Sequence, residues 1–178
     1  MTALLLRPAG LQDVPAMQAV YAHHVLHGLG SFEELPPDAE ELAHRWQNVV
    51  ERGLPWLAAE IAGDLVGYAY AGPYRTRRAY RYTLENSVYV AAGHAGRGLG
   101  RALLTRLIAG CEAGAWRQMV AVIGDSANTA SIRLHESLGF THVGVLAAVG
   151  FKHGRWVDTV LMQRALAQGD QAPPSADQ

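Results

Sequence analysis

The stretch LENSVYVAAGHAGRGLGRALL, from Leu84 to Leu104, decides the fold of this chain. Its first part has the β-branched and aromatic residues of a buried strand. Four glycines then fall within eight residues, and an apolar run at helical spacing follows from Leu99. The stretch therefore predicts a strand, a glycine-rich turn and the start of a helix.

The glycine cluster predicts a site for phosphate groups. It leaves backbone N–H groups unshielded at a helix N-terminus, where the helix dipole also favours negative charge. A P-loop would end in Gly-Lys-Ser/Thr, and the sequence has no such ending here. The dinucleotide fingerprint G-x-G-x-x-G is incomplete, because Gly96 and Gly98 supply its first two glycines and no glycine stands at its last position. Both nucleotide-binding folds are disfavoured, and a plain glycine-rich turn is the alternative.

The composition limits the partners and the location. The 178 residues are enough for one domain with its own core. Lys and Arg number 15 against 16 Asp and Glu, so the chain has no basic field and nucleic acid is not expected as a partner. A single cysteine, Cys111, is typical of a reducing compartment. Without a membrane-length apolar run or a leader pattern, we expect a soluble cytoplasmic protein.

The remaining chain predicts strands and helices in the order β-α-α-β-β-β-α-β-α-β-β. Strands are expected over residues 4–7, 56–61, 65–71, 87–90, 119–123, 141–151 and 156–162. Helices are expected over residues 10–25, 38–53, 99–113 and 128–138. A hairpin turn at Ala62-Gly63-Asp64 joins the second and third strands. Residues 1–166 are expected to form the domain, and the polar residues 167–178 a disordered tail.

Three further segments have side chains suited to ligand binding. Four arginines and three tyrosines lie between Tyr74 and Tyr82, which predicts either a solvated loop or an anion clamp at the mouth of a pocket. Phe32 lies in the loop before the second helix and is either a hydrophobic anchor or a pocket wall. His23 and His27 are spaced i, i+4, but no third ligand accompanies them, so no metal site is expected.

Two motifs resemble those of the Gcn5-related N-acetyltransferases (GNAT). The family signature Q/R-x-x-G-x-G/A falls on Ala95–Gly100, with Ala95 where the family has Gln or Arg. A second signature, N-x-x-S/A-x-x-x-Y-x-x-x-G-F, falls on Asn128, Ser131, His135, Gly139 and Phe140. The resemblance covers Leu4 to about Leu166. It implies a single-domain α/β (α+β) fold, with a mixed, mostly antiparallel twisted sheet of about seven strands, a splayed parallel pair and about four flanking helices.

The resemblance implies that acetyl-coenzyme A binds along the central strand and the glycine-rich turn. The pantetheine arm would take the place of a strand where Val88–Val90 part from residues 119–123, and the N–H of Val90 is expected to face the thioester oxygen. Arg97 and Arg101 would supply charge to the phosphates. The implied acetyl-coenzyme A residues are Val88, Tyr89, Val90, Gly96, Arg97, Gly98, Leu99, Gly100, Arg101, Asn128 and Ser131.

Acetyl transfer from a thioester to an amine requires a deprotonated amine, a polarised carbonyl and a proton for the thiolate. Glu85 starts the central strand and is expected to take the proton of the amine; the alternative is an exposed strand end. Many family members have a tyrosine as the thiolate acid where this chain has His135. With an ordinary pKa of about 6.5, His135 is expected to act as acid or base. The alternative is a packing histidine that bonds a carbonyl.

Several stretches resemble the phosphinothricin and methionine sulfoximine or methionine sulfone N-acetyltransferases within that family. They are Ser31–Glu34, Tyr74–Arg75, Thr83–Val90, Ser131–Glu136 and Val149–Asp158. The resemblance implies homodimers and an anionic, amino-acid-like substrate with a free α-amine. The implied substrate residues are Phe32, Arg75, Thr76, Arg77, Glu85, Asn86, Ser87 and Lys152. The alternatives are an N-acetyltransferase for proteins or small amines, and a coenzyme-A-binding module without catalysis.

Overall fold

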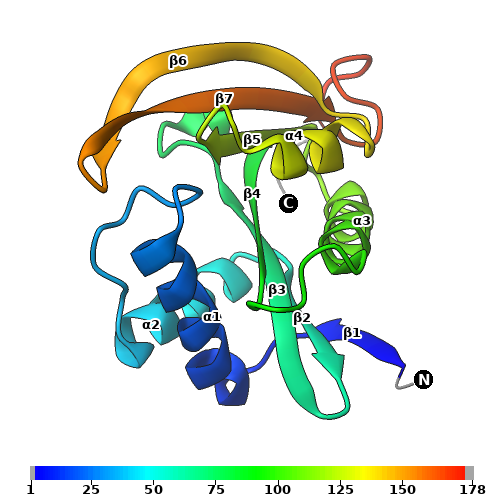
Figure 1. Cartoon of the computed structure of the whole chain (residues 1–178). Helices are drawn as coiled ribbons and strands as arrows, with labels where there is room; N and C mark the ends of the chain where they lie inside the picture. The colour runs from blue at the N-terminus through cyan, green and yellow to red at the C-terminus, as the bar shows by residue number, and fades with distance from the viewer. Residues whose placement is uncertain (1–2, 175–178) are drawn as a thin grey trace.

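In the part of the chain that the structure describes, seven strands form one mixed sheet in the order β1-β2-β3-β4-β5-β7-β6 (Figure 1). The computed structural model describes residues 3–174. The strands are β1 (Leu4–Pro8), β2 (Trp56–Ile61), β3 (Asp64–Pro73), β4 (Thr83–Val90), β5 (Gln118–Gly124), β6 (Thr141–Lys152) and β7 (Arg155–Ala165). Neighbouring strands are antiparallel except for β4 and β5, which are parallel. The predicted fold class, including its parallel pair, is confirmed.

Helices cover both faces of the sheet (Figure 1). They are α1 (Val14–His27), α2 (Ala39–Val50), α3 (Leu99–Glu112) and α4 (Thr129–Glu136), with short 3-10 helices η1 (Leu11–Asp13) and η2 (Arg78–Tyr80). α1 and α2 lie on one side of the sheet, whereas α3 lies on the other side. Among residues 3–174, none of the helices combines the length and the apolar content that crossing a membrane requires.

Successive side chains along each strand point to opposite faces of the sheet, so each face packs against a different helix. On the α1 face, the rings of Trp56 and Tyr70 stack with centroids 4.0 Å apart, and Trp56 Nε1 donates to Met17 Sδ of α1. On the α3 face, Gly67 leaves room for Leu103, because a Cβ at Gly67 would lie 3.3 Å from Leu103 Cδ1. The strands β3 and β4 therefore form a packed platform between two helical layers.

The ends of two predicted segments are refined by the structure. The hairpin between β2 and β3 turns at Ala62 and Gly63, whose positive φ angles of 57° and 91° fit a two-residue turn of the primed type. At the C-terminus, residues 167–170 form turns, and the N–H of Gly169 donates to Leu166 O at 2.8 Å. Residues 175–178 of the predicted tail lie outside the described residues, so its disorder stays a prediction.

The parallel strands β4 and β5 separate soon after they meet. Their pairing within residues 3–174 covers three positions, and the last joins Glu85 to Val120. The backbone bonds Ala91 N to Val66 O and Tyr74 N to Thr83 O show that odd-numbered residues along β4 bond to β3. In an antiparallel pair the intervening residues direct their N–H and C=O the other way. Asn86, Val88 and Val90 therefore face the gap beside β5, which we call the fork.

Candidate active site

A cavity of about 890 Å³ opens at the fork. Its walls come from α1, the loop 28–37, β3, β4, the glycine-rich turn, β5 and α4. The predicted site residues that line it are Phe32, Glu85, Asn86, Ser87, Val88, Tyr89, Val90, Gly96, Gly98, Gly100, Arg101, Asn128, Ser131 and His135. One cavity is thus lined by residues of both motifs and by residues from segments that are far apart in the sequence.

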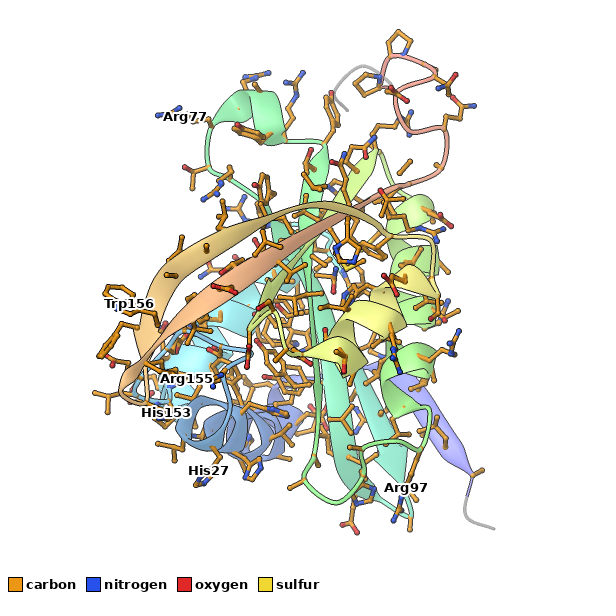
Figure 2. All side chains as sticks on the ribbon, turned by 45° about the horizontal axis from the view of Figure 1, so that its top comes forward. His27, Arg77, Arg97, His153, Arg155 and Trp156 are labelled. Atoms are coloured by element: carbon orange, nitrogen blue, oxygen red, sulfur yellow. The ribbon has the colours of Figure 1, made fainter. Side chains whose placement is uncertain are left out.

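Six predicted site residues lie outside the lining of this cavity. They are Arg75, Thr76, Arg77, Arg97, Leu99 and Lys152. Leu99 is buried in the core, where its side chain helps to fix α3. Arg77 lies on the η2 segment and Arg97 on the glycine-rich turn, and both side chains point away from the body of the protein (Figure 2). The arginine-rich segment therefore borders the site from outside in this structure.

The glycine-rich turn presents the start of α3 to the cavity. Gly96 and Gly98 have φ angles of 75° and 80°, in the left-handed region that favours glycine. Gly98 is the N-cap of α3, so the N–H groups of the first turn lack helical acceptors and point toward the cavity side of the helix end. Arg101 adds a positive charge to the lining, whereas Ala95 adds none. This donor set fits a diphosphate.

Asn86 and His135 connect three elements at the fork. Asn86 Nδ2 donates to Val120 O of β5 at 3.3 Å, and Asn86 Oδ1 lies 3.0 Å from His135 Nε2. The other ring nitrogen, Nδ1, lies 2.8 Å from the main-chain oxygen of Ser131. The side chain of Asn86 spans the gap between β4 and β5, which a backbone hydrogen bond would close in an ordinary parallel pair. The amide of Asn86 thus takes the place of the strand pairing that ends at Glu85.

The environment of His135 matches the packing alternative. The residue is 4% exposed, and both ring nitrogens face oxygens of the protein. Burial lowers its pKa, and the hydrogen bond to the Ser131 carbonyl opposes this effect. The ring therefore packs between α4 and β4 and contacts both elements.

Glu85 is half-buried in the cavity wall, at the point where β4 leaves β5. Burial raises the pKa of its carboxyl group, and the positive charge of Arg75 opposes this shift. A carboxylate with a raised pKa is a better proton acceptor near neutral pH than an exposed one. In the described residues, no group of three or more His, Cys, Asp or Glu side chains is placed to hold a metal ion.

A further wall of the cavity was not predicted from the sequence. It consists of residues on α1, the loop 28–37 and β3: Tyr21, His24, Ser31, Glu33 and Tyr70. Tyr21 Oη lies 2.9 Å from Ser31 Oγ and donates to Glu33 Oε1 at 3.1 Å. His24 Nε2 lies 2.9 Å from Val90 O and donates a hydrogen bond to it in the matching tautomer. Ser31 and Glu33 lie in a stretch that carries the family resemblance, but no motif marks Tyr21, His24 or Tyr70, and helical spacing assigns Tyr21 to the core.

The chain belongs to the Acetyltransferase (GNAT) family, whose model matches residues 19–140. It is 58% identical over 162 residues to phosphinothricin N-acetyltransferase of Alcaligenes faecalis, covering 91% of this chain and 82% of that protein. It is 40% identical over 173 residues to L-methionine sulfoximine/L-methionine sulfone acetyltransferase of Salmonella typhimurium, covering 97% and 99%. The predicted family and enzyme class are confirmed.

The same relationship is seen among solved structures. A GNAT superfamily phosphinothricin acetyltransferase from Sinorhizobium meliloti, crystallised in complex with AcCoA, superposes with a TM-score of 0.95 at 42% identity. The match covers 99% of this chain and 95% of that one. The whole described fold is therefore shared with that structure.

Proposed function

We propose that this protein transfers the acetyl group of acetyl-coenzyme A to the α-amine of an anionic amino-acid-like substrate, such as L-phosphinothricin, methionine sulfoximine or methionine sulfone. One observation carries the proposal: the backbone N–H groups of Val88 and Val90, which face the fork, the carboxylate of Glu85 and the N-terminus of α3 share one cavity. The names of the relatives support the substrate class, because their similarity extends over most of the chain.

The order of groups along β4 supports an orientation for acetyl-coenzyme A. The diphosphate would be held at Gly96–Arg101, and the pantetheine arm would run along β4 toward Glu85. Val90 lies nearer the glycine-rich turn, whereas Val88 lies nearer Glu85. The sequence alone favours Val90 as the donor to the thioester oxygen. We assign this role to the N–H of Val88, because the reacting carbonyl must meet an amine beside Glu85.

Glu85 would take one proton from the ammonium group of the substrate, directly or through water. The amine nitrogen then bonds to the thioester carbon and the carbon–sulfur bond breaks. The nitrogen loses its second proton, and the thiolate of coenzyme A takes up that proton, directly or through water. His135 was a candidate for that last step. Its burial and its two protein contacts support a role in holding α4 and β4 together instead.

The test is an assay of thiol release with acetyl-coenzyme A and a panel of amines. We expect turnover with L-phosphinothricin or methionine sulfone, and a loss of about 10²- to 10⁴-fold in kcat for Glu85→Gln. Glu40→Gln, on the exposed face of α2, is the control and should leave kcat unchanged. Acetylation of peptides alone would favour a protein acetyltransferase. Calorimetric binding of coenzyme A without any turnover would favour a non-catalytic module.

We also propose a homodimer that forms along β6. This strand is at one edge of the sheet, and residues 141–149 are all exposed. Its large exposed apolar side chains are Val143, Val145, Leu146, Val149 and Phe151, and Trp156 follows on β7. Trp156 is 67% exposed and points outward from the end of the β6–β7 hairpin (Figure 2). A free apolar edge of this length is typical of an interface, and an antiparallel second copy of β6 fits it.

A cytoplasmic location also remains our proposal.

A further inference from the structure

Lys152 is a buried lysine to which the proposed chemistry gives no task. It is the last residue of β6, is 2% exposed and does not line the cavity. Its Nζ donates a hydrogen bond of 2.7 Å to the main-chain oxygen of Ser31. Burial lowers its pKa, and the charges of Glu34 and Glu33 oppose that effect. Because a buried ammonium group is costly without hydrogen bonds, this contact ties the end of β6 to the loop 28–37.

The loop lies directly on the ends of two strands. A Cβ at Gly150 of β6 would overlap the ring of Phe32, and a Cβ at Gly124 of β5 would lie 3.0 Å from the same ring. On the other side, Ser31 Oγ contacts Tyr21 Oη of α1. The segment Gly30–Glu33, which supplies four residues to the cavity wall, is therefore clamped between α1 and β6.

The segment Gly30–Glu33 borders one particular half of the cavity. The loop 28–37 follows α1, on the face of the sheet opposite α3 (Figure 1). In the proposed function the N-terminus of α3 holds the diphosphate. The half beside Phe32 is then left for the amine substrate.

We propose that Lys152 is a positioning residue for the amine substrate: its hydrogen bond to Ser31 O fixes the segment Gly30–Glu33 and thereby the Phe32 wall. The inference rests on the proposed function. It differs from the role implied by family resemblance, in which Lys152 contacts the substrate directly. A direct grip would require Nζ in the cavity, whereas Nζ is used at Ser31 O.

The experiment compares Michaelis constants in Lys152→Met, which keeps the length of the side chain and removes the donor. We expect the KM for the amino-acid substrate to rise roughly tenfold, because a buried carbonyl loses its charged partner. The KM for acetyl-coenzyme A and its calorimetric affinity should stay within about twofold, since the loop lies away from the diphosphate site. Lys152→Arg, which retains a cationic donor, should restore part of the amino-acid KM. His153→Asn, on the exposed turn beside Lys152, is the matched control.

A double-mutant cycle with Phe32→Ala separates positioning from direct contact. If Lys152 acts through the Phe32 wall, Lys152→Met adds little to the amino-acid KM once Phe32 is alanine. Additive effects, or equal increases in both Michaelis constants, would overturn the proposal. If Lys152→Met does not fold, Lys152→Arg takes its place in the cycle with the same criterion. Failure of the wild-type enzyme to acetylate any amine would instead refute the proposed function itself.

Discussion

Two opposing effects set the proton affinity of Glu85. Burial raises the pKa of the carboxyl group, and the charge of Arg75 lowers it. Arg75 therefore acts on the proposed base although it does not line the cavity. An arginine in this position would keep the base deprotonated over a wider pH range and also attract an anionic substrate.

Replacing Arg75 with alanine should shift the acidic limb of the pH profile. Without the positive charge the pKa of Glu85 rises further, so the base is protonated up to a higher pH and kcat/KM at acidic pH falls. Arg77→Ala is the matched control, because Arg77 is not among the causes of the Glu85 shift. The measurement is kcat/KM against pH for the three proteins. Identical acidic limbs in wild type and Arg75→Ala would contradict this account of Glu85.

A second prediction concerns the glycine beneath Phe32. Gly150→Ala places a methyl group in the space of the Phe32 ring, so the ring must move at a cost of about 1–3 kcal/mol. The KM for the amino-acid substrate should rise while Lys152 stays intact. Gly110→Ala on α3 is the control, since a Cβ at Gly110 would make only ordinary contacts with Pro55 at 3.7 Å. Equal kinetics for the two variants would show that the Phe32 wall does not shape the substrate site.

The elements that the sequence predicts well are those encoded by local patterns. The glycine-rich turn and α3 follow from residues that are neighbours in the chain, and the second motif places Asn128 at the N-cap of α4, where its Oδ1 accepts from Ser131 N. The contacts that the sequence does not predict are those between distant segments. Lys152 meets Ser31 across 121 residues, and His24 meets Val90 across 66. Side-chain identity alone does not reveal such pairs, because packing of whole elements brings them together.

The fork between β4 and β5 gives an element-scale prediction. Asn86→Ala removes the amide that bonds Val120 O and faces His135 Nε2, so two buried polar groups lose a partner. We expect a loss of about 1–3 kcal/mol in the free energy of unfolding. The affinity for acetyl-coenzyme A should fall as well, because the spacing of the fork is no longer fixed. Urea unfolding and calorimetry measure the two effects. Asn48→Ala, exposed on α2, should change neither quantity. An Asn86 variant as stable as wild type would show that the Asn86 amide does not hold β4 and β5 together.

At the scale of the whole molecule, the substrate side of the enzyme and the free sheet edge are continuous. A smaller cavity of about 210 Å³ lies between Tyr74 and Tyr80 of the arginine-rich segment and Val143 of β6. The Lys152 contact joins the other end of β6 to the loop with Phe32. A second copy on β6 would therefore press on both the arginine-rich segment and the Phe32 loop, so assembly and substrate binding should be linked.

The two edges of the sheet allow a matched test of that link. Val143→Lys with Val145→Lys places charges on the apolar edge β6, and charged side chains on an edge strand oppose pairing with another chain. We expect this protein to sediment as a monomer, with a higher KM for the amino acid than the wild type has and little change for acetyl-coenzyme A. Leu5→Lys, on the opposite edge β1 and 50% exposed, should leave the dimer intact. A wild-type protein that is monomeric at micromolar concentration would exclude the dimer. A β6 variant that still dimerises would place the interface elsewhere. Unaltered substrate kinetics in a monomeric β6 variant would show that each pocket is complete within one chain.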